Sequence, residues 1–286
     1  MENKTYPVTV YANHELNVPN LNWRTSISVD HFNFADVTPF KVFWQLEPED
    51  IGQVEKKLIK NHEFYDLILT YNSNVLSECP NAVFFANNGV WTTESDVSQK
   101  KFQVSFLTSA KVLCEGHRLR VDIFKKLQED LNGRYRPPVP VTMHMSPPYL
   151  PDKRSMLVPF QYAVSIQNSQ QHNYFSEILL DCFATKTIPI FGGCLNIGQF
   201  FNSDGILSLG EIYQGRDIVV EIKKILNSLT PDFYYSPKVQ AAIEENYQKA
   251  LLYQDRIGLL VKAITDSWIP KIQKVHSGLP NVPPQD

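Results

Sequence analysis

The hydrophobic pattern of residues 160–207 predicts a strand–helix–strand unit. Alternating apolar side chains over 162–166 indicate a strand, and the amide-rich stretch 167–173 indicates a loop. Residues 174–185 carry apolar side chains at helical spacing, and the apolar run 187–193 ends in two glycines, as a short buried strand before a turn does. This order of elements predicts a βαβ unit of a parallel sheet.

The first hundred residues repeat this alternation. By the same patterns we expect a helix at 51–59 and strands at 7–11, 41–46, 66–70 and 81–86. The aromatic, asparagine-rich segment that precedes residue 41 fits no element. The alternation predicts that this part of the chain forms an α/β domain of its own.

The pattern after residue 100 predicts the remaining elements. We expect a strand at 100–108, helices at 117–131 and 217–229, a short strand within 202–209, and a long helix at 237–269 that Gly258 divides and Pro270 ends. The proline-rich residues 132–159 predict an irregular connection, and residues 276–286 predict disorder.

Composition narrows the class of protein. The chain has 286 residues and a net charge of −3, so no basic surface indicates nucleic-acid binding. No run of eighteen apolar residues occurs, and the N-terminal residues lack the apolar core of a signal peptide, which predicts no transmembrane segment. The four cysteines form no C-x-x-C pair and no metal-ligand spacing with the seven histidines, so we expect a reduced, cytoplasmic protein without a metal.

Polar residues follow the strand at 162–166, where a parallel sheet places its ligands. These are Gln167, Asn168 and Tyr174, together with Glu177 in the first turn of the next helix. An acid at that position stabilises a helix N-terminus, and this alone explains Glu177. Alternatively, its carboxylate accepts hydrogen bonds from ligand hydroxyls, as the acid of nucleotide-binding βαβ units does from ribose.

Glu47 follows the strand at 41–46, and Pro48 fixes an extended backbone at this point. A carboxylate at a strand end is placed for proton transfer. The alternatives are a solvated acidic turn formed with Glu49 and Asp50, and a metal-binding acid pair, although no D-x-D occurs in the chain.

Arg118 and Arg120 fall in the first turn of the helix at 117–131, where the helix dipole favours acids over bases. A base there is poorly placed for helix stability, but it can share an anion with the helix N-terminus. Arg binds two phosphate oxygens at once, so we expect an anion clamp at Arg120; a surface arginine is the alternative.

These residues resemble the donor-binding motif of the α-1,3-fucosyltransferase family. The matching text is VSIQNS at 164–169, YFSEI at 174–178 and KTIPIFGG at 186–193, in the family's order and spacing. Two positions depart from it, because Gln167 replaces a Glu and Ile178 replaces a Lys that contacts the donor diphosphate in the family. Lys153 and Arg154 could supply the charge that is missing at Ile178.

The resemblance implies a GT-B fold, in which two Rossmann-like α/β domains face each other across a cleft. The domains would be residues 1–98, which bind the acceptor, and 99–256, which bind the donor, while 257–286 form a helix that crosses back and a flexible tail. The resemblance also implies which residues form the active site. Glu47 would be the catalytic base of a W-x-x-x-E-S-P-like motif in which the Ser is missing, and the donor would be bound by Arg120, Lys153, Gln167, Asn168, Ser169, Tyr174 and Glu177.

The function implied is that of an inverting glycosyltransferase that needs no metal and no cofactor. It would transfer fucose from GDP-fucose, or xylose from UDP-xylose as some sugar transferases of large algal viruses do, to a hydroxyl of an oligosaccharide or glycoprotein glycan. A bacterial or viral origin fits this expectation. The alternative is a non-catalytic sugar- or nucleotide-binding protein that retains the GT-B fold.

Overall fold

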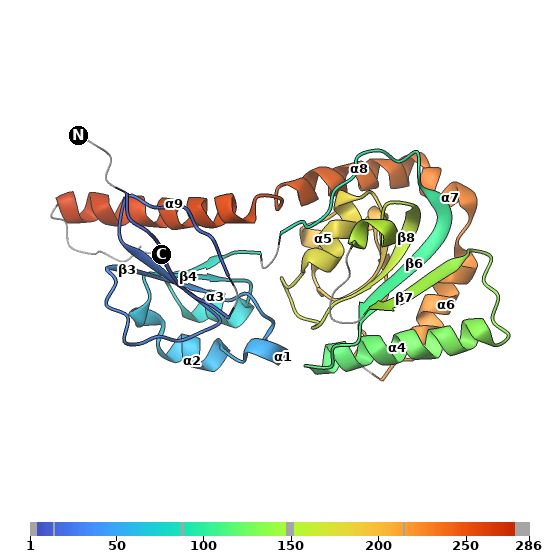
Figure 1. The fold of residues 1–286 in the computed structure, drawn as a ribbon, viewed down its shortest axis with the longest axis horizontal. Coiled ribbons are helices and arrows are strands. Elements are labelled where there is room, and N and C mark those ends of the chain that lie inside the picture. Colours follow the sequence, from blue (N-terminus) through green and yellow to red (C-terminus); the bar gives the residue numbers. More distant parts are fainter. Residues whose placement is uncertain (1–4, 14, 87–88, 147–151, 214, 278–286) are drawn as a thin grey trace.

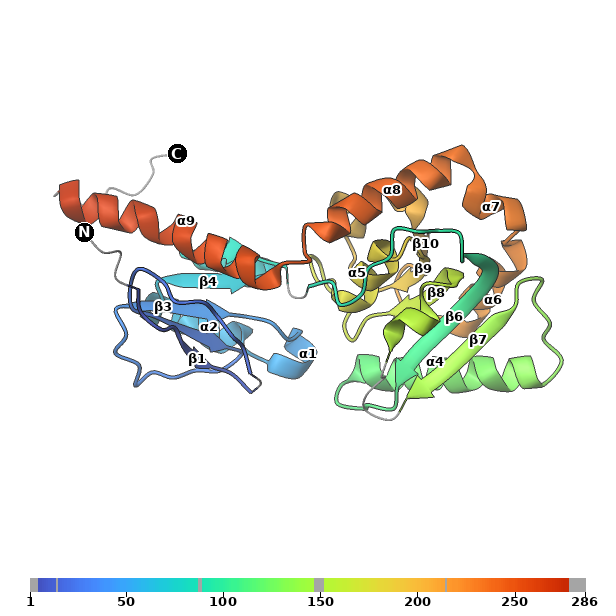
Figure 2. The same ribbon diagram turned by 45° about the horizontal axis from the view of Figure 1, so that its top comes forward.

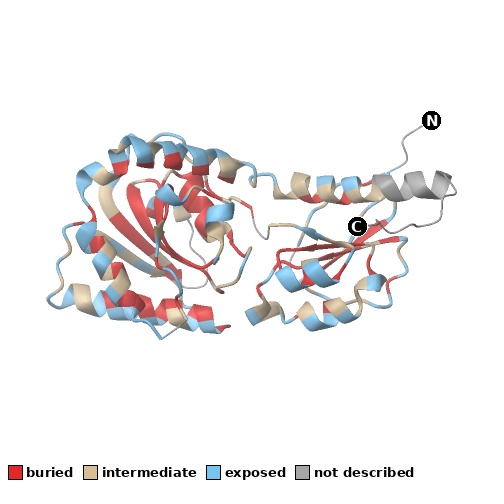
Figure 3. Cartoon of the chain, turned by 180° about the vertical axis from the view of Figure 1, so that it is seen from behind, coloured by how far each residue is buried: buried red, intermediate tan, exposed pale blue. Residues whose placement is uncertain are grey.

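The computed structural model describes residues 5–13, 15–86, 89–146, 152–213 and 215–277, and side chains as far as Trp268. Two five-stranded parallel sheets dominate it, one in each half of the molecule (Figure 1). The central strands of each sheet are buried, whereas the edge strands are partly exposed and the helices expose their outer faces (Figure 3).

The first sheet has the strand order β1-β2-β3-β4-β5, with every neighbouring pair parallel. Its strands are β1 (Thr9–Tyr11), β2 (Thr25–Val29), β3 (Phe40–Trp44), β4 (Leu67–Thr70) and β5 (Ala82–Phe84). Short helices connect them, namely α1 (Glu49–Gly52), α2 (Glu55–Lys60), a 3-10 turn (His62–Phe64) and α3 (Ser73–Glu78).

Side chains of β3 alternate between two hydrophobic layers. Val42 and Trp44 pack with α9 (Arg256–Ser277), whereas Phe43 packs on the opposite face with α2 and α3. Helix α9 runs along this sheet in both ribbon views (Figures 1 and 2). Trp268 of α9 stacks on Trp23 with ring centroids 5.3 Å apart, so the last helix completes the core of the first sheet.

The second sheet has the order β10-β9-β8-β6-β7 and is also parallel throughout. Its strands are β6 (Lys101–Ser109), β7 (Val141–Ser146), β8 (Phe160–Ile166), β9 (Ile188–Gly192) and β10 (Leu207–Ser208). The helices of this half are α4 (Glu115–Asn132), α5 (Glu177–Ala184), α6 (Ile218–Ser228), α7 (Pro231–Tyr235) and α8 (Pro237–Leu251), with 3-10 turns at Lys153–Met156, Ile197–Gln199 and Ser203–Gly205.

The two faces of this sheet differ in chemistry. Val104, Phe106 and Val164 join the large core that α4, α6 and α8 cover. The alternate positions face α5 and the 3-10 turn at Lys153–Met156, and three of them carry small side chains, namely Ser105, Ala163 and Ser165. Small residues on that face leave room above the sheet.

The loop after β8 holds the two halves of the molecule together. The Asn173 side-chain amide donates to the Tyr71 carbonyl at 3.3 Å and to the Ser73 hydroxyl at 3.1 Å. The rings of Tyr71 and Tyr174 lie 5.0 Å apart, and the Ser169 hydroxyl bonds the carboxylate of Asp50.

Several predicted elements differ from those observed. The expected helix at 51–59 is two helices, because Gln53 adopts a left-handed backbone (φ 49°) after α1. Strand β2 and helix α3 were not predicted. The region 132–159 contains strand β7, because its prolines flank residues 141–146 instead of interrupting them.

The long C-terminal helix also differs. It breaks at residues 252–255, ahead of Gly258, because Asp255 accepts the Gly258 amide at 2.8 Å and so caps a new helix. Helix α9 continues past Pro270 to Ser277, so the prediction that Pro270 ends the helix is wrong. Most of the expected disordered tail lies outside the described residues.

Candidate functional site

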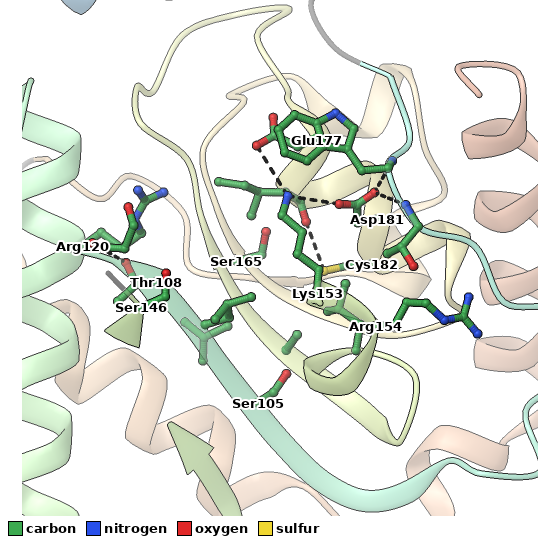
Figure 4. A pocket seen from close by; sticks show the side chains of 18 of the residues that line it. Ser105, Thr108, Arg120, Ser146, Lys153, Arg154, Ser165, Glu177, Asp181 and Cys182 are labelled. Carbon is green, nitrogen blue, oxygen red and sulfur yellow. Dashed lines mark hydrogen bonds and ion pairs between the residues drawn. The ribbon is translucent and has the colours of Figure 1, made fainter. Parts of the chain in front are cut away.

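A cavity of about 520 Å³ lies at the carboxyl end of the second sheet (Figure 4). Its walls come from β6, β7 and β8, from the first turns of α4 and α5, and from the 3-10 turn at Lys153–Met156. Trp91 and Thr92, in the connection between the two sheets, close one side. In open parallel α/β sheets this is the edge at which ligands bind.

Arg120 lies in the second turn of α4, because the helix begins at Glu115 and not at His117. The guanidinium is buried, and its Nη1 donates to the Ile166 carbonyl at 3.2 Å and to Asn168 Oδ1 at 3.0 Å. Its Nε has no partner among the described residues. The group is therefore held rigidly at the cavity with donor capacity to spare.

The close approach of α4 to the loop after β8 requires a glycine. A Cβ on Gly116 would lie 2.0 Å from the carbonyl oxygen of Asn168. No side chain fits this gap without moving the backbone. Gly116 thus sets the distance between the two elements that carry Arg120 and Asn168.

Lys153 places a second cation in the cavity. Its Nζ lies 3.3 Å from Asp181 Oδ2, 3.7 Å from Glu177 Oε1 and 4.1 Å from the centroid of the Trp91 ring (Figure 4). Asp181 also accepts the Trp91 and Thr92 amides, at 2.7 and 3.1 Å. Burial raises the pKa of Asp181, and the charge of Lys153 opposes this effect.

At the opposite end of the cavity, its neutral end, small and apolar side chains lie over the sheet. Asp152 and Arg154 also line the cavity, and the Arg154 guanidinium pairs with Glu94 at 2.7 Å. Ser105 lies at the neutral end, away from Glu177 and Arg120 (Figure 4), and Leu107 and Leu157 also line the cavity. The Ser105 hydroxyl is fully buried and has no hydrogen-bond partner in the part of the chain that the structure describes. A buried hydroxyl is costly when unpaired, so this end suits a ligand with both flat apolar and polar surface.

His117 also lines the cavity, and sequence reasoning assigned it no role. Its Nδ1 lies 3.0 Å from the sulfur of Cys114. Burial lowers the pKa of His117 to about 4, and the charges of Arg120 and Lys111 act in the same direction. The imidazole is therefore neutral at pH 7 and adds no charge of its own.

Glu47 stands after β3, on the first half of the molecule, and is exposed. The Tyr71 hydroxyl donates to its main-chain carbonyl at 3.2 Å. Although the side chain is exposed, nearby protein atoms partly desolvate its carboxylate and raise the pKa of Glu47. The charge of Glu177 raises this pKa further, and that of Lys111 lowers it. The carboxylate therefore feels charges from the second half of the molecule, although it does not line the cavity.

The comparisons with known proteins identify the architecture. No protein-family model matches the sequence, and no curated protein matches it. A solved α1,3-fucosyltransferase with GDP superposes with a TM-score of 0.50 at 15% identity, over 85% of this chain and 77% of that one. The chain has a GT-B fold.

Other GT-B structures agree with this assignment. The pneumococcal O-GlcNAc transferase GtfA, solved with UDP and GlcNAc, gives a TM-score of 0.54 at 10% identity, and S. aureus TarM gives 0.51 at 13%. The chain covers 57% and 55% of those two proteins. The predicted α/β architecture is thereby confirmed, whereas the boundaries at residues 98 and 256 stay a prediction.

The GT-B cavity gathers four of the predicted donor-binding residues: Arg120, Lys153, Asn168 and Glu177. Ile178 lines it too, where the fucosyltransferase motif has Lys, and Lys153 is the cation that lies beside Glu177 there. Arg120 and Glu177, 57 positions apart in the sequence, thus meet at one sheet edge.

Three other predicted residues lie elsewhere. Gln167 is buried and its side-chain oxygen accepts the Ser176 hydroxyl at 2.6 Å. Ser169 and Tyr174 are buried where the two halves meet, against Asp50 and Tyr71. None of the three lines the cavity, because the loop turns their side chains inward.

Two further kinds of feature were sought among the described residues, a metal site and a membrane-spanning helix. Within them, no group of three or more His, Cys, Asp or Glu side chains could hold a metal ion. Among the helices they form, none is both long and apolar enough to cross a membrane.

Proposed function

We propose that this chain is a glycosyltransferase that takes a nucleotide sugar as donor. The observation that carries the proposal is the cavity at the carboxyl end of the second sheet, where Arg120, Lys153 and Glu177 converge. Solved structures with the same fold include a fucosyltransferase with GDP and an O-GlcNAc transferase with UDP, and this likeness supports a nucleoside diphosphate as the bound group.

In this proposal Arg120 and Lys153 bind the diphosphate. The guanidinium of Arg120 is already oriented by Ile166 and Asn168, so little conformational entropy is lost when it binds an anion. Negative charge grows on the diphosphate as the sugar leaves, and a fixed cation stabilises that charge more in the transition state than in the ground state. Lys153 takes the place of the Lys that Ile178 replaces.

The nucleoside would extend toward the neutral end. Glu177 is 3.7 Å from Lys153 and is placed to accept hydrogen bonds from ribose or sugar hydroxyls. The flat base would lie above Ser105, between Leu107 and Leu157, where the unpaired hydroxyl gains a partner. Asn168, whose side-chain oxygen accepts a hydrogen bond from Arg120 at 3.0 Å, would lie beside the diphosphate.

Glu47 would remove the proton from the acceptor hydroxyl. Its raised pKa makes it a stronger base than an ordinary carboxylate, which favours proton transfer near neutral pH. A single base without a covalent nucleophile gives one displacement and inversion at the anomeric carbon. We propose that no metal is needed, because Arg120 and Lys153 neutralise the leaving group.

The donor is GDP-fucose or UDP-xylose in this proposal, and the acceptor is a hydroxyl of an oligosaccharide or glycoprotein glycan in the cytoplasm. Fucose follows from the motif at 164–193, and xylose from its departures at Gln167 and Ile178. The fold alone does not select a substrate.

The test is a thermal-shift panel of GDP-fucose, UDP-xylose, UDP-glucose, GDP and UDP, with and without EDTA, followed by an assay for sugar transfer. A ligand that binds the native state raises the apparent melting temperature with its concentration relative to Kd. A shift with GDP compounds alone assigns fucose, and a shift with UDP compounds alone favours xylose.

Two further outcomes would change the proposal. Binding without transfer to any glycan acceptor would favour the non-catalytic binding protein, to which the pairing of Lys153 with two carboxylates also points. No shift with any nucleotide, in a folded sample, would overturn the proposed donor class. Loss of the shift on adding EDTA would contradict the metal-free mechanism.

A further inference from the structure

An aspartate at the end of β2 lies against the backbone of Glu47. Strands β2 and β3 pair in parallel with Val29 opposite Trp44, so the residue after β2 lies beside the residues that follow β3. Asp30 Oδ1 accepts the Leu46 amide at 2.8 Å, and Oδ2 accepts the Glu47 amide at 2.9 Å. Both carboxylate oxygens thus hold the segment that presents Glu47.

The backbone of Asp30 is itself unusual. Its φ is 50°, in the left-handed region that a residue other than glycine seldom adopts. The Asp30 amide donates to the Trp44 carbonyl at 3.1 Å, which ties this turn to the end of β3. Aspartate tolerates the conformation better than most side chains, and the surrounding bonds maintain it.

We propose that Asp30 is a positioning residue for Glu47, which fixes the direction of the proposed catalytic base. The inference rests on the proposed transferase function. From the other side, the Tyr71 hydroxyl holds the Glu47 carbonyl, so the backbone of Glu47 is fixed at both its N–H and its C=O. The side chain alone remains free to turn toward an acceptor.

The charges around Asp30 link this contact to pH. Burial raises the pKa of Asp30 to about 7; the two amide bonds oppose that effect, while the charges of Glu47 and Glu49 add to it. Glu47 in turn faces Glu177 and Lys111.

The sign of the effect follows from these contacts. Above about pH 7 Asp30 is ionised and accepts both amides strongly. Below that pH it is protonated, and its hydrogen bonds to the Leu46 and Glu47 amides weaken. Turnover should therefore rise as the pH increases through about 7.

The experiment compares Asp30→Asn with Asp66→Asn. Asp66 is a matched control, because its Oδ2 also accepts a β3 amide, that of Lys41 at 2.8 Å, but at the opposite end of the strand. For Asp30→Asn we expect kcat to fall about 10- to 100-fold with donor KM unchanged, since a small misplacement of a catalytic group has this effect. The rise of kcat near pH 7 should disappear, and Asp66→Asn should keep it.

A second readout works without turnover and without a variant. In wild-type protein the backbone ¹⁵N–¹H resonances of Leu46 and Glu47 should titrate with an inflection near pH 7, as Asp30 gains its proton. Resonances that pass through this pH unchanged would overturn the proposal even if Asp30→Asn does not fold.

The remaining outcomes separate the two proposals. A kcat that falls in Asp30→Asn while its pH profile keeps the wild-type shape would mean a merely structural role and would overturn the inference. Wild-type protein that binds no nucleotide and transfers no sugar would remove the transferase function, and with it the role of Asp30 in the reaction. In that case the amide titration would report only a structural contact.

Discussion

The carboxyl ends of the two sheets carry opposite chemistry. In the first half, Asp30 and Glu47 follow β2 and β3, and the charge of Glu47 adds to the raised pKa of Asp30. In the second half, Arg120 and Lys153 line a cavity at the carboxyl end of the sheet. In the proposed function, the same parallel architecture thus carries a proton acceptor in one half and an anion site in the other.

A GT-B chain can in this way carry its proposed catalytic base and its proposed anion site on different sheets. Cations beside Glu47 would lower its pKa and weaken it as a base. Placing Glu47 and the two cations on separate sheets avoids this, although Glu177 and Asp181 lie beside Lys153 and the charges of Glu177 and Lys111 still act on Glu47. The following substitutions test whether the two halves act separately in proton transfer and in donor binding.

The largest effect is expected from Glu47→Gln. The amide keeps the shape of the side chain but cannot accept a proton, so kcat should fall about 100- to 10,000-fold, while the donor Kd stays within about twofold. Initial-rate kinetics and calorimetry with the donor measure the two quantities. Glu63→Gln, an exposed acid of the same half, is the control. A donor Kd that weakens in parallel would mean that the two halves do not divide the work.

Arg120→Met should act on the other half. Without the guanidinium the donor Kd should weaken about 100-fold, because a charge-assisted contact to the diphosphate is lost. Arg118→Met is the matched control on the same helix, since Arg118 is exposed and does not line the cavity. Equal donor binding in the two variants would exclude Arg120 as the clamp.

Ser105→Leu should fill the neutral end of the cavity. We expect nucleotide affinity to fall about tenfold, since the base loses its place, whereas pyrophosphate should bind as before. Calorimetry with the nucleotide and with pyrophosphate separates these results, and the melting temperature shows whether overpacking has destabilised the fold. Undiminished nucleotide affinity would place the base elsewhere.

The smallest effect is expected from Tyr174→Phe. Its ring is buried against Tyr71 and outside the cavity, so removal of the hydroxyl should leave the donor Kd within about twofold. A tenfold weaker Kd would restore Tyr174 as a donor contact and would move the binding site toward the junction of the two halves.

The sequence predicted the order of elements well wherever apolar periodicity was strong. The strand at 160–166 and helix α4 are examples, because burial on a defined face leaves a period in the sequence. Strand β2 was missed although Thr25–Val29 is rich in β-branched residues, since no helix pattern flanks it. Asp30, the residue that ends it, was missed for the same reason.

The site was harder to predict than the fold. A motif shows which residues are neighbours in sequence, but Gln167, Ser169 and Tyr174 turn away from the cavity that Asn168 and Glu177 line. Whether a loop residue points in or out depends on partners such as Asp50 that lie far away in the sequence. Lys153 was predicted because its charge could replace the one missing at Ile178; it lines the cavity, and its contact with a donor stays a prediction.

The packing of α9 has a consequence for biosynthesis. Leu260, Ile264 and Trp268 close the hydrophobic face of the first sheet, yet the ribosome adds them after the entire second half. At about 5–20 residues per second, the nascent first half waits on the order of ten to forty seconds with that face open to solvent. The half that is made first is therefore finished last, and a chain stopped before α9 leaves Trp44 and its neighbours uncovered.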